Sequence, residues 1–162
     1  MIKKLLILLF ISFCTSQITA QTGSTVIGEL NNGVYELNQH QGALVKAFEW
    51  TFRDGTKVID LKIEQLSNSY FLVATCAYQG RKRIAALNLE QEGIRFVLTD
   101  DAQYKMCSAV ACETCKFFLE NNKIVACKCE ETGTISNHCH YKSTPGAGFY
   151  ANFMRAIKLQ KD

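Results

Sequence analysis

The chain has 162 residues, with 18 Lys or Arg and 15 Asp or Glu, which gives a formal net charge of +3 at pH 7. Removal of residues 1–20, which we expect, takes away Lys3 and Lys4 and leaves 16 basic and 15 acidic residues, a charge of +1. A protein so close to neutral has no long-range field of one sign, so charge argues against nucleic acid or an anionic membrane as a partner.

Residues 1–20 have the three parts of an export signal. Lys3 and Lys4 precede an apolar run from Leu5 to Phe13, and a small residue, Ala20, ends the segment. The run is much shorter than the roughly 20 apolar residues that a membrane-spanning helix needs. We predict cleavage near Ala20, a periplasmic or extracellular location, and no membrane span in the mature chain. Residues 21–162 are a suitable length for a single soluble domain.

Residues 25–99 contain short alternating apolar runs separated by turn residues, which is typical of antiparallel strands with one face in water. Asn32-Gly33 and Asp54-Gly55 are predicted two-residue hairpin turns. Arg81-Lys82-Arg83 follows Gly80 and is interpreted as a solvated hairpin tip. The prediction is a meander of hairpins without crossover helices, with strands at 26–30, 34–37, 47–52, 57–63, 70–78, 83–89 and 94–99.

The predicted strand at 70–78 is apolar on both faces, because Leu72 and Ala74 alternate with Phe71 and Val73. We therefore expect it to be a central strand. Cys76 lies within it and is predicted to be a free, buried thiol that behaves as a small apolar residue.

Six cysteines form the most informative cluster in the chain, over residues 107–139. A hairpin with its turn at Asn121-Asn122 would place Thr114 opposite Cys129 and Lys116 opposite Cys127. Cys115 lies between these pairs, so local geometry alone would bring four sulfurs together. The six candidates for disulfide bonding are Cys107, Cys112, Cys115, Cys127, Cys129 and Cys139.

Disulfides are the favoured interpretation of this module, because an exported thiol meets an oxidising environment. Six cysteines allow 15 pairings, and sequence cannot choose among them. Cross-links would strengthen a region that is poor in large aliphatic side chains. This interpretation gives the module no catalytic role.

A metal site is the alternative, since Cys112-x2-Cys115 followed by Cys127-x-Cys129 resembles the paired knuckles that hold zinc in ribbon-like modules. His138 and His140 flank Cys139 and could add nitrogen ligands, which would suit zinc or copper. The disulfide interpretation, in contrast, implies no cofactor.

Thiol-redox chemistry is a further alternative, with Cys112 as the attacking thiolate and Cys115 as the resolving thiol. Thioredoxin-like enzymes need strand–helix–strand units, and no such alternation precedes Cys112. The spacing of Cys107, Cys112 and Cys115 also resembles three ligands of a plant-type ferredoxin, but the intervening loop lacks the glycines that would let amides approach the sulfurs. No phosphate-binding loop or hydrolase motif is present, so a role other than catalysis is favoured.

The apolar residues of 149–160 fit a helix or a strand, and we favour a helix. The fold class is thus mainly β, an antiparallel meander or small sandwich or barrel, with a C-terminal cysteine-rich hairpin module and a terminal helix. We expect an exported binding or envelope-structural protein whose partner is another envelope or extracellular protein. This functional expectation comes from the class of protein alone.

Overall fold

The computed structural model describes residues 23–132 and 138–160. The export signal predicted for residues 1–20 lies outside the described residues. The described chain is mainly β, as predicted, with ten strands and two helices. They are β1 (Ser24–Asn31), β2 (Val34–Leu37), α1 (Gln41–Phe52), β3 (Lys57–Leu66), β4 (Ser69–Tyr78), β5 (Arg81–Glu92), β6 (Arg95–Thr99), β7 (Gln103–Ala109), β8 (Cys115–Glu120), β9 (Lys123–Cys129), β10 (Cys139–Pro145) and α2 (Ala147–Lys158).

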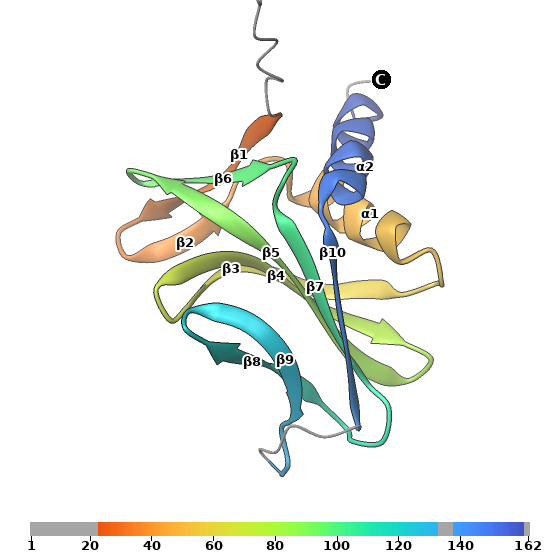
Figure 1. The fold of residues 1–162 in the computed structure, drawn as a ribbon. Coiled ribbons are helices and arrows are strands. Elements are labelled where there is room, and N and C mark those ends of the chain that lie inside the picture. The colour runs from red at the N-terminus through yellow and green to blue at the C-terminus, as the bar shows by residue number, and fades with distance from the viewer. Residues whose placement is uncertain (1–22, 133–137, 161–162) are drawn as a thin grey trace, which may run out of the picture.

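The main sheet is antiparallel and nearly closed into a barrel (Figure 1). Its strands run in the order β2-β1-β6-β5-β4-β3 around the barrel. The gap lies between β2 and β3, where the Tyr35 hydroxyl donates a hydrogen bond to Gln65 Oε1 at 3.1 Å. This sheet confirms the prediction of a small antiparallel β fold.

Strand β5 belongs to two parts of the sheet. Its first half pairs with β7 over Arg83–Leu87, and its last residues pair with β6 over Glu90–Glu92. Strand β10 then pairs with the free side of β7. The sheet therefore extends beyond the barrel through β5, β7 and β10, and this extension carries the candidate site.

Two-residue turns set the register of three hairpins. Asn32 and Gly33 both have positive φ angles, of 49° and 82°, as a type I′ turn requires. The same pattern occurs at Gln79-Gly80 and at Asn121-Asn122. The predicted turn at Asn32-Gly33 is therefore confirmed.

The predicted strand at 47–52 is wrong, because these residues are the second half of helix α1. Phe48, Trp50 and Phe52 alternate with polar residues and so imitate a strand. The buried residues Ala43, Leu44, Ala47 and Phe48 follow a helical spacing, which is consistent with the helix that forms. Asp54-Gly55 consequently connects a helix to β3, and a helix does cross over between β2 and β3.

Strand β4 is central, as predicted, and each of its faces supports a separate core. Leu72, Ala74 and Cys76 face helices α1 and α2 in what we call the helix-side core. Phe71 and Val73 face the β8–β9 hairpin in what we call the hairpin-side core. The molecule thus has three layers: two helices, the sheet and the hairpin (Figure 1).

Helix α2 confirms the helical interpretation of the tail, and its Phe149, Phe153, Ala156 and Ile157 are buried in the helix-side core. Gly146 precedes it in close contact with the backbone of Ala102, where a Cβ would collide with the carbonyl oxygen. The sharp entry into α2 therefore depends on glycine.

Candidate functional site

At the base of the cysteine-rich hairpin, the observed pairing of β8 with β9 differs by one residue from the predicted pairing. Cys115 lies opposite Cys129 and Phe117 opposite Cys127, whereas Leu119 lies opposite Ile124 near the turn. Val125 is an extra residue on β9, and this irregularity shifts all later pairs by one. The predicted pairing of Thr114 with Cys129 and of Lys116 with Cys127 is therefore wrong. A bulge of this kind leaves no local signal in the sequence.

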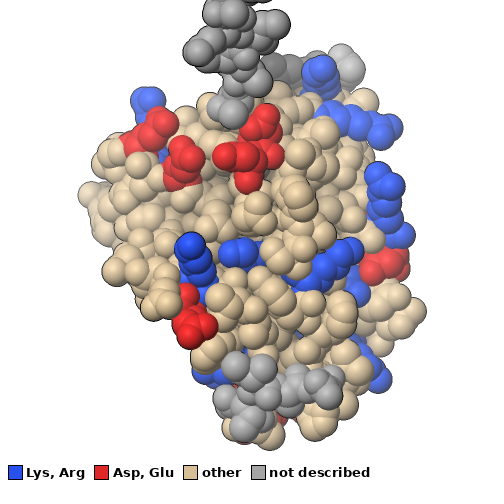
Figure 2. Space-filling view, in the orientation of Figure 1, with Lys and Arg blue, Asp and Glu red and all other residues tan. Residues whose placement is uncertain are grey.

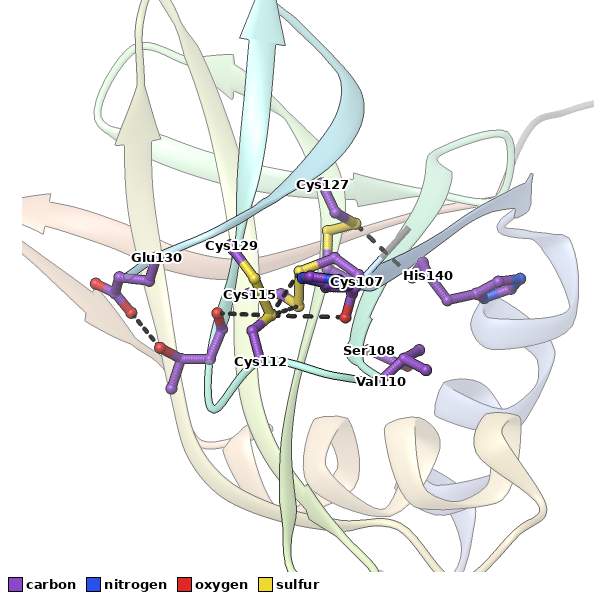
Figure 3. Close-up of a disulfide and its surroundings, with 12 residues drawn as sticks. Cys107, Ser108, Val110, Cys112, Cys115, Cys127, Cys129, Glu130 and His140 are labelled. Carbon is purple, nitrogen blue, oxygen red and sulfur yellow. Dashed lines mark hydrogen bonds between the residues drawn. A yellow bond between two sulfur atoms is a disulfide. The ribbon is translucent and has the colours of Figure 1, made fainter. Parts of the chain in front are cut away.

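Three disulfides attach the hairpin to the sheet (Figure 3). Each joins segments that are distant in the chain, with Cα–Cα distances of 5.8, 6.1 and 6.0 Å. The first fastens β9 to β7, the second fastens the end of β9 to the loop after β7, and the third fastens the start of β8 to the start of β10. The pairs are Cys107–Cys127, Cys112–Cys129 and Cys115–Cys139.

Two of these disulfides lie against one another. The Sγ atom of Cys112 is 3.4 Å from that of Cys115 and 3.2 Å from that of Cys139. Of the four sulfurs expected to meet, Cys112, Cys115 and Cys129 do so, but Cys139 takes the place of Cys127. The Cys127 sulfur is instead bonded to Cys107.

Neither histidine of the alternative metal site belongs to a group of converging ligand atoms in the described residues. His140 lies opposite Ser108 in the β7–β10 ladder, and its imidazole is directed away from the sulfurs in Figure 3. The His138 carbonyl oxygen accepts hydrogen bonds from the backbone N–H groups of Val110 and Ala111, at 2.8 and 3.1 Å. Within the described residues, ligand atoms converge in two groups, Cys112 with Cys115 and Cys139, and Cys112 with Cys129 and Glu131. Every sulfur in these groups belongs to a disulfide, so neither group offers a thiolate in the oxidised protein.

Cys76 is the one free cysteine in the described part of the chain, and it is fully buried in the helix-side core. Burial raises the pKa of its thiol to about 12. A thiol that stays protonated and has no access to solvent is a poor nucleophile.

Arg83 is the residue whose observed environment differs most clearly from the predicted one. It is only 8% exposed, whereas Arg81 is exposed, so the predicted solvated tip holds for Arg81 and is wrong for Arg83. Alternation along β5 places Arg83 on the same face as Ala85 and Leu87, which belong to the helix-side core. This alternation was the feature of the sequence that could have predicted the burial of Arg83.

The buried guanidinium of Arg83 has polar partners from two segments, the α1–β3 connection and strand β7. Its Nη1 donates to Asp54 Oδ2 at 2.7 Å and to the Thr56 hydroxyl, and its Nε donates to the Ser108 hydroxyl at 2.9 Å. The ring centroids of Tyr78 and Phe52 lie 4.3 and 5.2 Å from its central carbon. These contacts hold the charge in one orientation.

Asp54 completes this network. Burial disfavours its charge, but hydrogen bonds from Thr56 and Arg83, together with the positive charge of Arg83, outweigh burial and lower the pKa of the carboxyl below its usual 3.8. Asp54 therefore remains ionised at neutral pH and neutralises the guanidinium.

A hollow of about 440 Å³ opens beside Arg83, where the sheet extends past the end of α1. We call it the polar groove and define it by Tyr78, Arg81, Arg83, Ser108 and His140. No Asp or Glu is among the described residues that line it. Sequence reasoning missed this groove, because it forms only when β5, β7 and β10 lie side by side.

The described helices are all too short to cross a bilayer. The fold and its cross-links define a small disulfide-rich β protein. The chain matches no family model, no curated protein and no solved structure among those with which it was compared.

Proposed function

We propose that the protein is an exported binding protein in which the disulfides are structural and the polar groove contacts an acidic segment of a partner protein. The observation that carries this proposal is the lining of the groove, in which no Asp or Glu lies among the described residues and Arg81 supplies a positive charge beside the Asp54-paired Arg83. Such a lining is complementary to carboxylates.

The groove has the composition of a recognition surface. Arg81 is exposed, and its Nη1 donates to the Val110 carbonyl oxygen, whereas Arg83 is buried and held by Asp54 and Ser108. Tyr78 adds an aromatic ring, and aromatic and arginine side chains are enriched where interfaces derive most of their binding energy. Ser108 and His140 supply further hydrogen-bonding groups on neighbouring strands.

Basic side chains are also present on the surface outside the groove. Figure 2 shows Lys and Arg side chains in a band across the middle of the visible face, with Asp and Glu mainly above the band and at its margins. Strand β10 adds the exposed Lys142, which lines a cavity together with Arg83, to the basic residues near the groove. An acidic partner would therefore meet favourable potential as it approaches.

The cysteine chemistry supports a structural role for the disulfides. Cys76 is buried and the six module cysteines are bonded to one another, so no free thiolate in the described chain is placed for redox catalysis.

Binding to the groove can be tested with a short fluorescein-labelled oligoglutamate peptide, followed by fluorescence anisotropy at low salt. Arg81→Ala should weaken binding by about fivefold, because an exposed arginine–carboxylate pair contributes up to about 1 kcal/mol. Arg95→Ala removes another exposed arginine, from β6, and serves as the matched control. Equal effects of the two variants, or equal binding of an oligoglutamine peptide, would contradict the proposed groove.

The structural role of the disulfides needs a separate measurement. Intact mass and thiol labelling of protein purified without reductant should show the loss of two hydrogens for each disulfide. After denaturation, Cys76 should be the only labelled thiol among the described residues. Retained zinc or copper, with four or more thiols labelled once the metal is chelated, would instead support the metal-binding alternative at Cys112, Cys115, Cys127 and Cys129.

A further inference from the structure

A second, smaller cavity adjoins the polar groove, between the end of α1 and strands β7 and β10. It has a volume of about 180 Å³, and we call it the recess. Its polar lining includes Asp54, Arg83, Tyr104 and Lys142. Arg83 also borders the polar groove, so the two cavities meet at this guanidinium.

Tyr104 lines the recess, and its hydroxyl group is unusual. Tyr104 is 4% exposed, and its hydroxyl oxygen is buried without a hydrogen-bond partner. Buried hydroxyls are normally satisfied, because an unmade hydrogen bond costs free energy. Burial also raises the pKa of Tyr104 well above its usual 10.0, so the group keeps its proton and can act as a donor.

Arg83 offers a second unused donor. The hydrogen bonds to Asp54, Thr56 and Ser108 use Nη1 and Nε, and none of them uses Nη2. Because these bonds fix the guanidinium, Nη2 is already oriented before any ligand arrives.

The charged groups and the apolar side chains that line the recess indicate which class of ligand it can bind. Arg83 and Lys142 carry two positive charges against the single negative charge of Asp54, which leaves one positive charge for a ligand to neutralise. Phe52 and Met106 form apolar walls. A single carboxylate on a short apolar tail matches the charge, the two donors and the walls.

We infer that the recess binds a small monocarboxylate, whose oxygens accept hydrogen bonds from the Tyr104 hydroxyl, Arg83 Nη2 and the Lys142 ammonium. The apolar tail lies against Phe52 and Met106. This ligand is distinct from the acidic partner of the polar groove, and either site can fail without the other.

Sodium butyrate is a suitable probe, with butyramide as the neutral control of the same shape. In a ¹⁵N NMR titration, butyrate should shift the amide signals of Tyr104, Lys142 and Thr144 in a saturable manner. Butyramide should not do so. If butyrate gives no saturable shifts, or butyramide gives the same shifts, the recess does not select a carboxylate and the inference is wrong.

Tyr104→Phe sharpens the test, because it removes only the hydroxyl. It should weaken butyrate binding by about tenfold, the typical effect of losing a hydrogen bond to a charged group. The free variant should unfold at the same temperature as the wild type or higher, since the hydroxyl has no partner to lose. This second measurement distinguishes a lost ligand contact from a damaged fold.

Tyr141→Phe is the matched control. Tyr141 lies on β10, but its hydroxyl donates to the Ile124 carbonyl oxygen at 3.1 Å within the hairpin-side core. The Tyr141→Phe variant should bind butyrate as tightly as the wild type does. Equal butyrate affinity in Tyr104→Phe and the wild type would mean that the hydroxyl does not contact the carboxylate, and would overturn the inference.

Discussion

The two faces of strand β4 are covered in different ways. On the helix side, Phe48, Phe149 and Phe153 pack around β4 with almost no exposed surface. On the hairpin side, Phe117 and Ile124 are the only large apolar side chains that the described hairpin buries fully, and three disulfides provide the remaining attachment. One face is thus stabilised by packing and the other by covalent cross-links. Where a layer has too few large apolar side chains to hold itself in place, cross-links take over that function.

The largest expected effect follows from the packed side. The Phe48 ring is fully buried, with its centroid 4.6 Å from that of Phe149. Phe48→Ala should lower the free energy of unfolding by about 3 to 5 kcal/mol, because it leaves a cavity between the two helices and the sheet. Urea unfolding of the oxidised protein measures this.

Phe118→Ala is the corresponding change on the hairpin, where the ring is only partly buried under Lys128. It should cost less than about 1 kcal/mol. If the two variants were equally destabilised, the proposed difference between the two layers would be wrong.

The cross-linked side should respond next most strongly. Removing the Cys107–Cys127 disulfide, with both residues changed to Ala, should cost about 3 kcal/mol, since the bond closes a loop with a sequence separation of 20. Hydrogen exchange should accelerate in β8 and β9 well before it accelerates in α1. Cys76→Ala, which breaks no cross-link, should leave exchange in the hairpin unchanged. Faster exchange in α1 than in the hairpin would show that the disulfide stabilises the whole fold and not this one layer.

The smallest expected effect concerns a charge beneath the hairpin. Lys105 is 8% exposed and faces the hairpin side, and burial, followed by the nearby charge of Lys123, lowers its pKa below the usual 10.5. Lys105→Met should therefore stabilise the protein by roughly 0.5 to 1 kcal/mol, a modest gain because a lysine ammonium can still reach water. Lys116→Met, at an exposed position of β8, should change stability very little.

The pH dependence gives an independent check on Lys105. Between its lowered pKa and 10.5, the unfolded chain holds a proton that the folded chain has lost, so wild-type stability should rise with pH in this window. The rise should be smaller in Lys105→Met. An identical pH profile in both proteins would show that the ammonium is not penalised by folding.

Much of the fold was predictable because its signals are local. Asn32-Gly33 determines a hairpin through the φ angles of two adjacent residues, and the doubly apolar run of β4 requires a strand that is covered on both faces. The clustering of six cysteines predicted a cross-linked module for the same reason, since export and proximity along the chain suffice for that expectation.

Other features depend on contacts between distant segments, and the sequence alone does not determine them. Residues 47–52 suit a strand or a helix, and packing of Phe48 against α2 favours the helix. The disulfide pairing depends on the bulge at Val125 and on the position of β10 beside β7.

The candidate sites belong to this second group. Arg83 is buried only because Asp54 approaches from the end of α1 and Ser108 from β7, and a buried charge is tolerated only with such partners. The unpartnered hydroxyl of Tyr104 likewise arises where β7, β10 and α1 meet. Local sequence therefore predicted most of the strands, the Asn32-Gly33 turn and the presence of a cross-linked cysteine module. The tertiary structure alone decided which side chains share a cavity, because a cavity is defined by segments that are neighbours in space and not in the chain.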